Sequence, residues 1–548
     1  MGSERLPPKT LFKIALTVNL VSVIWNIISD CDETYNYWEP LYFIINGKGF
    51  QTWEYSPIYG LRSYLYLLIY GWPAVLIKLI FKSVSNRFLF YLIRIYMASV
   101  TSLLEMDLYK SFTSYLKNDN EDKVPIYSIL ILMLSAGSFI ASTAFLPSSF
   151  AFYCSLLAFS RWLRQDYNVM IAAVAASTIL GWPFSAAIGI PLAIDILLFQ
   201  RKIIFFIKSA LFWGIIFTIS SVLIDSWFYG RISFPSLNIV TYNVFTSHGG
   251  PELYGVESTM FYVKNYLLNF NIAVPMVLLG IPVLTFNHKA ASNLNRVAIM
   301  SISVLIVWNL VFFLQAHKEE RFMFPCYPFV GVSAGVALYQ WQLIFNKFTL
   351  GKHFPKQMLA TVFIGVYSVI SASRILAIIL SFNAPMAIYS HFNDISGADG
   401  KMLCLGREWH RFPSSFIMTA SPSLNISFIQ SDFKGQLPGK FSGASILIAT
   451  RNHRNQLFND LNQEVKSRYV GLSSCDFIVD RIDGRPQTVN EPDWELVTDM
   501  KWRPLMKYKL LYPFSSESRS SVLRSFYFPI LFERYNQFID YVVYEKIV

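Results

Sequence analysis

Three carboxylates stand close together near the N-terminus of the chain. Asp30, Asp32 and Glu33 fall within four consecutive positions, directly after an apolar run that is long enough to cross a membrane. Carboxylates at that boundary are costly unless something pairs with them or uses them. A carboxylate placed against a hydroxyl group can act as a general base. The group is therefore a candidate catalytic centre, although the same residues could form an acidic N-cap for a short helix.

Aromatic and hydrogen-bonding side chains follow in the same loop. Sugar recognition needs flat aromatic faces beside planar polar groups, and the loop supplies both. The residues that could line such a site are Trp38, Gln51, Trp53, Glu54, Tyr55 and Arg62. An aromatic belt at the membrane interface is the simpler alternative, but a belt does not require the interleaved Gln51, Glu54 and Arg62. We therefore interpret the loop as facing a sugar.

A second cluster of ionisable residues lies much later in the chain. Five of them, from His317 to Arg321, stand in a row between two strongly apolar segments. Arg321, His317 and Lys318 could bind a phosphate, since arginine offers a planar fork that fits phosphate oxygens. A cytosolic turn would favour Lys and Arg but not two glutamates as well. The cluster is predicted to be part of a site.

The composition indicates a membrane protein. Of the 548 residues, 54% are hydrophobic and only 15% are charged, which is too apolar for an ordinary soluble domain. The net charge of +11 is spread over short clusters that flank apolar runs, so we expect no nucleic-acid partner. The first apolar run, 11–28, is predicted to be a retained span with a cytosolic N-terminus.

Runs of membrane-spanning length recur through the first two thirds of the chain. About eleven or twelve crossings are expected, depending on whether the long run 168–199 is broken at Gly181-Trp182-Pro183. The runs are 11–28, 64–81, 88–104, 126–145, 149–163, 168–199, 204–224, 270–286, 296–314, 322–341 and 358–381. Residues 1–384 are thus predicted to form a transmembrane domain with luminal loops at 29–60 and 226–269.

The remaining residues, 385–548, have the texture of a soluble α/β domain, with predicted strands at 444–449 and 477–479. The triplet Asn425-Ile426-Ser427 is a glycosylation acceptor that is usable only in a lumen, and it weakly favours a luminal domain. Five cysteines are too few for a disulfide scaffold. Cys404 and Cys475 could pair in an oxidising compartment, and the sequence leaves that pairing open.

Other functional classes find less support. The chain has no phosphate-binding glycine loop and no paired-cysteine metal spacing. A nucleotide-sugar donor is therefore not expected. A transporter or lipid flippase is a rival, because those proteins also combine many spans with buried charge. It should show two similar halves with corresponding interrupted spans, and the sequence has no such repeat.

Three stretches together, 30–40, 48–57 and 317–322, resemble the dolichol-phosphate-mannose-dependent mannosyltransferases of the GT-C fold class. The resemblance runs essentially the whole length of the chain and includes 406–416. It is strongest to the α-1,2 branch of the asparagine-linked glycosylation pathway, because Asp30-Cys31 stands where the glycosylphosphatidylinositol-pathway relatives typically have His-Pro. The glutamate that this branch shows after Ser-Pro is Ile58 here, which excludes a catalytic carboxylate at that position.

The resemblance implies a polytopic helical membrane protein of the endoplasmic reticulum with its active site facing the lumen. It implies transfer of mannose from dolichol-phosphate mannose, with inversion and in α-1,2 linkage, to the dolichol-pyrophosphate-linked oligosaccharide, as the seventh and ninth mannoses. A sister enzyme that makes a different linkage, in the late N-glycan or glycosylphosphatidylinositol-anchor pathway, is the alternative that residue chemistry does not separate. The oligomeric state does not follow from the sequence.

Within this resemblance each candidate residue has an expected role. Inversion needs one general base and no covalent intermediate. Asp32 is the first choice for that base, with Glu33 as its rival and Asp30 in support. Arg321, His317 and Lys318 are expected to hold the donor phosphate without a metal ion or other cofactor. The acceptor sugar is expected to contact Trp38, Gln51, Trp53, Glu54, Tyr55 and Arg62.

Overall fold

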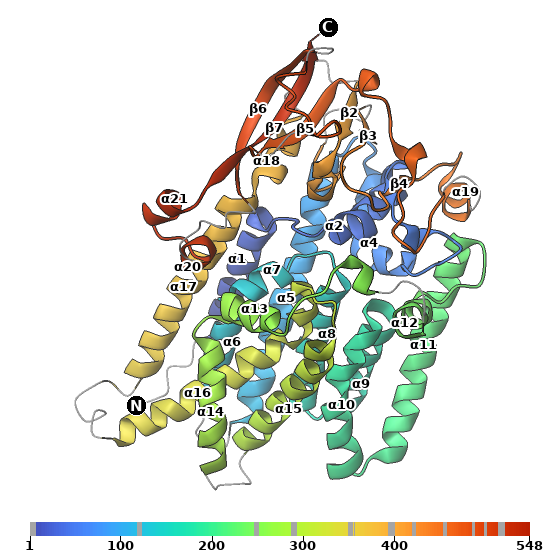
Figure 1. Ribbon diagram of the computed structural model, residues 1–548. Coiled ribbons are helices and arrows are strands. Elements are labelled where there is room, and N and C mark those ends of the chain that lie inside the picture. The colour runs from blue at the N-terminus through green and yellow to red at the C-terminus, as the bar shows by residue number, and fades with distance from the viewer. Residues whose placement is uncertain are drawn as a thin grey trace.

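A bundle of apolar helices carries a mixed β-sheet at one end (Figure 1). The computed structural model describes residues 7–117, 123–245, 251–286, 293–348, 355, 357–392, 400–418, 424–452, 457–484, 488–497, 501–512 and 521–547. Within these ranges the five-stranded sheet begins only after residue 400. The expected combination of a helical membrane part with an α/β C-terminal region is confirmed.

The helices of the bundle follow the predicted apolar runs closely. They are α1 (Pro8–Trp25), α4 (Tyr64–Ile80), α5 (Asn86–Tyr115), α6 (Val124–Met133), α7 (Ala136–Ala141), α8 (Pro147–Leu163), α9 (Tyr167–Ala176), α10 (Ala186–Ile194), α11 (Ile203–Tyr229), α14 (Ala273–Phe286), α15 (Asn293–Leu314), α16 (Tyr327–Lys347) and α17 (Met358–Phe382). Among the described residues six helices are long and apolar enough to cross a membrane, and several shorter apolar helices accompany them. The count of eleven or twelve crossings stays a prediction.

Two of the predicted runs are interrupted. The run 168–199 breaks where the sequence indicated, because a π-helical turn, η3 (Ser177–Gly181), ends at Trp182 and the 3₁₀ turn η4 (Pro183–Ser185) follows. The proline lacks the N–H that a continuous helix needs. The run 126–145 was wrongly predicted as one helix. It divides at Ser135, whose hydroxyl caps α7 by accepting the N–H of Ser138 at 2.9 Å.

The two predicted luminal loops contain short elements. The first holds α2 (Cys31–Glu33), the π-helix η1 (Thr34–Trp38), α3 (Glu39–Asn46), β1 (Phe50–Gln51) and η2 (Trp53–Tyr55). The second holds α12 (Pro235–Phe245), η6 (Pro251–Tyr254) and α13 (Met260–Phe270). The turn η7 (Glu320–Cys326) then leads into α16. These connections, and not the spans, carry most of the predicted site residues.

The C-terminal sheet has the strand order β3-β2-β5-β7-β6. Its strands are β2 (Met402–Leu405), β3 (Asn425–Phe428), β5 (Phe477–Ile482), β6 (Lys501–Leu511) and β7 (Phe538–Ile547). β2 pairs in parallel with β3 and β5, whereas β7 is antiparallel to β5 and β6. The remaining short elements are α18 (Ala384–His391), η10 (Arg407–Arg411), β4 (Gly439–Lys440), α19 (Ile446–Arg451), η11 (Lys466–Arg468), η12 (Leu472–Ser474), α20 (Ser521–Ser525) and α21 (Leu531–Tyr535).

Two predictions for this region have opposite outcomes. The strand at 477–479 is confirmed as part of β5. The strand at 444–449 is wrong, because Ser445 accepts the N–H of Ile448 and starts the short helix α19. A six-residue apolar run cannot by itself distinguish a strand from a helical turn. Cys404 and Cys475, whose pairing the sequence left open, form a disulfide with a Cα–Cα distance of 5.8 Å.

Strand pairing and hydrogen bonds attach the C-terminal region to the first loop. β1 pairs with β4, so that Phe50 lies opposite Lys440 and Gln51 opposite Gly439. The hydroxyl of Thr34 donates to the carbonyl oxygens of Phe412 and Pro413, both at 3.0 Å. The fold thereby places a segment near residue 410 against residues 30–40, although the two segments are far apart in the sequence.

Glu39 is a fully buried carboxylate in this contact. It has no exposed surface, and its carboxylate accepts the Ser415 N–H at 2.6 Å and the hydroxyls of Ser414 and Ser415 at 3.2 and 3.0 Å. Burial raises the pKa of Glu39 to about 7, although these hydrogen bonds oppose the shift. The serines therefore compensate a carboxylate that would otherwise be costly to bury.

Candidate active site

A cavity of 740 Å³ lies between the helix bundle and the C-terminal region. Three chemically different groups line it. Carboxylates and cations come from the two predicted luminal loops and from the segment around residue 320, namely Asp30, Asp32, Glu54, Arg62, Glu257, His317, Lys318, Glu319 and Arg321. Apolar side chains come from the bundle and from residues 239–261 of the second predicted loop, and neutral side chains come from the C-terminal region. The two clusters that the sequence singled out separately thus share one cavity.

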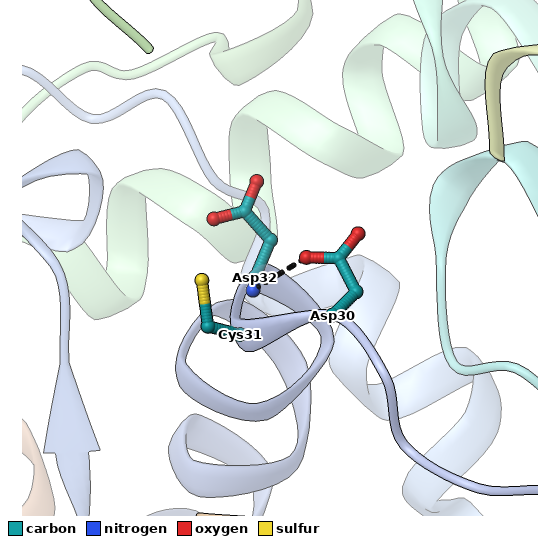
Figure 2. Close-up of side chains that lie close together, drawn as sticks. All are labelled: Asp30, Cys31 and Asp32. Carbon is teal, nitrogen blue, oxygen red and sulfur yellow. Dashed lines mark hydrogen bonds between the residues drawn. The ribbon is translucent and has the colours of Figure 1, made fainter. Parts of the chain in front are cut away.

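Asp30 and Asp32 enter the cavity from the start of α2 (Figure 2). Asp30 is the N-cap of this helix, and its Oδ1 accepts the Asp32 N–H at 2.8 Å. The N-cap interpretation is therefore correct for Asp30, yet both carboxylates also line the cavity. The cap fixes the backbone at Asp32 and leaves the Asp32 carboxylate out of this bond.

Arg321 joins the two clusters. Its guanidinium lies 3.1 Å from Asp30 Oδ2, 2.6 Å from Asp32 Oδ2 and 2.5 Å from Glu319 Oε2. Burial raises the pKa of Asp30 to about 7, while the positive charge of Arg321 opposes the shift. Burial would also raise the pKa of Glu319, but Arg321 and His317 outweigh it and lower that pKa to about 2. One cation is thus shared by three carboxylates.

His317 and Lys318 support this centre from the same segment. His317 Nε2 lies 2.9 Å from Glu319 Oε1, and this hydrogen bond raises the pKa of His317 above its usual value. Lys318 is almost fully buried, and its ammonium donates to the carbonyls of Gln315 and Glu257. Both side chains line the cavity, although the Lys318 ammonium is already hydrogen-bonded to backbone carbonyls.

A second ion pair lies on the cavity wall beside Asp32. Arg62 donates to both oxygens of Glu54, at 2.8 and 3.0 Å, and to the hydroxyl of Tyr37. Asn36 donates to the same Glu54 at 2.7 Å. Burial raises the pKa of Glu54, and the nearby Arg62 charge opposes it. The pair is bidentate, so it holds this wall in a defined geometry.

Glu33 lies outside the cavity, in the core of the protein. Only 3% of it is exposed, and its Oε1 accepts the Trp38 indole N–H and the Phe145 backbone N–H, each at 2.9 Å. The π-helical turn η1 brings residues five apart, such as Glu33 and Trp38, onto one face. Glu33 does not line the cavity. Its position is that of a buried structural carboxylate.

The predicted sugar-facing residues divide into two sets. Trp53, Glu54 and Arg62 line the cavity. The other three, Trp38, Gln51 and Tyr55, do not line the cavity. Trp38 is fully buried against Phe90, Phe145 and Phe416. Gln51 lies in β1, and the Tyr55 hydroxyl donates to the Asn36 carbonyl. These three form the support behind the wall.

Sequence reasoning missed two groups of cavity residues. The apolar group includes Trp182, whose ring lies 5.2 Å from that of Phe312 and 5.1 Å from that of Phe322. The break at Gly181-Trp182-Pro183 was recognised, but not that it faces a cavity. The neutral group is Trp409, Phe433, Gln436, Leu437, Pro438 and Asn462. Of this group, only the stretch around Trp409 was indicated by the sequence, as part of the family resemblance at 406–416.

A metal ion has one set of possible ligands among the described residues. Single ligand atoms of Asp30, Cys31 and Asp32 lie within 4.8 Å of one another. Arg321 already neutralises both carboxylates of this set. Burial and the two neighbouring carboxylates raise the pKa of the Cys31 thiol well above its usual value, which disfavours the thiolate that metals bind. The donor set therefore suits the guanidinium better than a metal ion.

Comparison with known proteins gives a consistent family. The model of the Alg9-like mannosyltransferase family matches residues 10–419. The chain is 38% identical to alpha-1,2-mannosyltransferase ALG9 of Mus musculus and to that of Homo sapiens, in each case over 97% of this chain and 88% of the relative. Among solved structures, ArnT from Cupriavidus metallidurans bound to undecaprenyl phosphate superposes with a TM-score of 0.49 at 13% identity, covering 84% of this chain and 90% of that one.

The different surroundings of Glu33 and Asp32 predict different effects of alanine substitution. Glu33→Ala leaves two buried N–H groups unpaired and should destabilise the protein by about 2–6 kcal/mol. Asp32→Ala should cost less than about 1 kcal/mol, because the Asp32 side chain is 36% exposed and Arg321 keeps two other carboxylates. Thermal denaturation of both purified variants measures the difference. Equal midpoints would contradict the structural role of Glu33.

Proposed function

Because the chain belongs to the Alg9-like mannosyltransferase family, we propose that it transfers mannose from dolichol-phosphate mannose to a dolichol-pyrophosphate-linked oligosaccharide in α-1,2 linkage. The observation that carries the proposal is the shared cavity in which Asp32 and Arg321 meet. In this ion pair Asp32 can serve as the base for an acceptor hydroxyl, and Arg321 can serve as the cation that binds a phosphate. Apolar aromatic residues beside them suit a lipid-linked donor.

The chemistry is a single in-line displacement with inversion. Asp32 accepts the proton of the acceptor mannose 2-hydroxyl as that oxygen attacks the anomeric carbon of the donor. The bond from this carbon to the phosphate oxygen breaks, and dolichyl phosphate leaves with the electron pair. The β-linked mannosyl phosphate becomes an α-mannoside. No covalent enzyme intermediate is required.

Arg321 is the residue we assign to the leaving phosphate. Its planar guanidinium can contact two phosphate oxygens and offset the negative charge that grows as the bond breaks. In the structure the guanidinium of Arg321 forms ion pairs with three carboxylates, those of Asp30, Asp32 and Glu319. The donor phosphate therefore competes with carboxylates for Arg321, and protonation of Asp30 would ease that competition. His317 keeps Glu319 in place, and Lys318 adds positive charge to the same wall.

Asp32 is favoured over Glu33 as the base on geometry. The Asp32 carboxylate lines the cavity, whereas Glu33 is enclosed behind it and holds Trp38 and Phe145. A general base must reach the proton it removes. Trp53, Glu54 and Arg62 lie on the same cavity wall and are assigned to acceptor contacts, with Trp38, Gln51 and Tyr55 supporting them from behind.

We place the cavity on the luminal side of the endoplasmic reticulum membrane. The disulfide between Cys404 and Cys475 belongs to the region that covers the cavity, and such bonds persist in oxidising compartments. Asn425, in the possible glycosylation triplet, is exposed at the start of the edge strand β3. Both features support a luminal C-terminal region, with the chain as a multi-span membrane protein.

The glycans of cells that carry Asp32→Asn in place of the native chain test the proposed reaction. We expect lipid-linked oligosaccharide truncated at six mannoses to accumulate, because the seventh mannose is the first that this enzyme would add. Asp540→Asn is the matched control, since Asp540 in β7 pairs with Lys509 of the edge strand β6 and does not line the cavity. Glycans of normal size with Asp32→Asn would remove Asp32 as the base. A different truncated intermediate would indicate a sister enzyme.

The pKa of Asp30, raised to about 7, predicts a pH dependence of donor binding. Below this pH Asp30 is neutral, and above it the carboxylate repels the donor phosphate and competes for Arg321. The donor KM should rise roughly three- to tenfold between about pH 6 and about pH 8. Asp30→Asn stays neutral and should flatten this rise. The same slope in the variant and the native enzyme would exclude Asp30 as its source.

Transfer is proposed to need no metal ion, because Arg321 supplies the positive charge at the phosphate. Initial rates measured with purified protein in EDTA should therefore equal those with added Mg²⁺ or Mn²⁺. Arg321→Lys keeps the charge but loses the fork, and it should reduce the rate by roughly ten- to a hundredfold in either buffer. Loss of activity in EDTA that a divalent ion restores would contradict this assignment.

A further inference from the structure

One wall of the cavity is built entirely by the C-terminal region and has no role in the steps above. Trp409 and Phe433 are half-buried there, with ring centroids 5.1 Å apart and planes inclined by 42°. The ring of Tyr35 lies 5.9 Å from that of Trp409, and its hydroxyl donates to the Trp409 carbonyl at 2.8 Å. The contact ties this aromatic wall to the loop that carries Asp32.

An amide group stands beside the aromatic rings. Asn462 lines the cavity, and its Oδ1 accepts the N–H of Gln436 at 2.9 Å. In the part of the chain that the structure describes, its Nδ2 donates no hydrogen bond. Gln436 is held in turn by Asn459, whose N–H donates to its Oε1 at 3.0 Å. The wall therefore presents a positioned N–H donor and a fixed support behind it.

The chemistry of this wall differs from the rest of the cavity. Its described lining residues, Trp409, Phe433, Gln436, Leu437, Pro438 and Asn462, include no ionisable side chain. Aromatic faces with an amide suit an uncharged hexose, which offers C–H surfaces and hydroxyls. The cation behind this wall, Arg468, does not line the cavity, because its guanidinium donates to the Leu437 carbonyl and to Gln436 Oε1. The aromatic cluster around Trp182 already offers an apolar surface for a lipid chain.

We propose that Trp409, Phe433 and Asn462 form the subsite for the terminal mannose arm of the acceptor glycan. This inference rests on the proposed function, because it assumes that a glycan enters beside Asp32. Trp409 and Phe433 contact the sugar faces, and Asn462 Nδ2 donates to a hydroxyl. Both arms that receive an α-1,2-linked mannose pass this wall, so one substitution affects both transfers.

Steady-state kinetics of the full-length protein in lipid nanodiscs test the subsite. Trp409→Ala and Asn462→Asp should each raise the KM for a lipid-linked acceptor glycan about tenfold, and the donor KM should stay within about twofold. Asn462→Asp keeps the acceptor for Gln436 N–H and suits the positive φ of 53° at this position, so the fold is preserved. Trp409→Phe keeps an aromatic face and should restore most of the acceptor affinity.

Gln537→Glu is the control, because it also replaces an amide by a carboxylate in the C-terminal region, at an exposed position outside the cavity lining. An unchanged acceptor KM in Trp409→Ala and Asn462→Asp overturns the subsite, as does a rise in the donor KM alone. A native enzyme that forms no α-1,2 product would instead refute the proposed function. The two failures are therefore distinguishable.

A second surface is independent of the catalytic proposal. The segment 521–535, between β6 and β7, lies against α17, one of the candidate membrane spans (Figure 1). Tyr527 exchanges two hydrogen bonds with Ser373, at 3.0 and 2.7 Å, and Arg374 donates to the Ser525 carbonyl at 3.0 Å. Ser373 lies nine residues before the end of α17, about 13 Å along the helix.

The other side of this segment is apolar and exposed. Ile530 is 83% exposed although its φ of 67° is costly for a β-branched residue. Its exposed neighbours are Val522, Phe528, Leu531 and Tyr535. Arg524 and Arg534 lie in the same short stretch. Aromatic, aliphatic and arginine side chains in this mixture are typical of the membrane interface.

We infer that residues 521–535 insert into the luminal face of the bilayer and anchor the C-terminal region to it. Lipid is the occupant that the surroundings favour, because the exposed side chains continue the exposed apolar face of α17 at Val369 and Leu376. The anchor holds the C-terminal region beside the membrane that supplies both lipid-linked substrates.

Fluorescence quenching in nanodiscs tests this surface. A polarity-sensitive dye is attached at Ile530→Cys or, as the control, at Val489→Cys, which is 98% exposed elsewhere in the C-terminal region. Cys31→Ser is included in both proteins, because the other free thiols are buried. The dye at 530 should be quenched by doxyl-labelled lipid and at least threefold less by iodide than the dye at 489. Equal iodide quenching overturns the anchor, and shielding from both quenchers would indicate a protein partner instead.

Discussion

The site depends on one guanidinium shared by three carboxylates. Arg321, Asp30, Asp32 and Glu319 come from two segments that are almost 290 residues apart in the chain. An isolated charge in this position would carry a large desolvation cost, and the mutual pairing offsets part of that cost. The same ion pairs that hold the two segments together also hold Asp32, the proposed base, next to Arg321, the proposed phosphate-binding residue.

The C-terminal region completes what the bundle begins. Its attachment through Thr34, Glu39 and the short β1–β4 pairing sets Trp409 against Tyr35. The cavity consequently has an ionic centre, an apolar side and a neutral aromatic side. These three environments match the lipid chain, the phosphate and the uncharged glycan of the proposed substrates.

Local backbone geometry explains why neighbouring carboxylates differ in role. Asp32 and Glu33 are adjacent, yet the helix α2, which Asp30 caps, directs Asp32 into the cavity and Glu33 into the core. The π-helical turn that follows brings Trp38 over Glu33. Such turns are frequent at functional sites because they re-aim side chains without ending the helix.

The sequence by itself determined the membrane character, the approximate spans, the break at Pro183 and the two ionisable clusters, because apolar length and misplaced charge are local signals. It also indicated the family. Only the tertiary structure decided that the clusters meet through Arg321, that Glu33 and Trp38 support the site from the core, and that Trp409, Phe433 and Asn462 form its third wall. These outcomes depend on contacts between residues hundreds of positions apart and on a single extra residue in a helical turn, which no local pattern of residue types encodes.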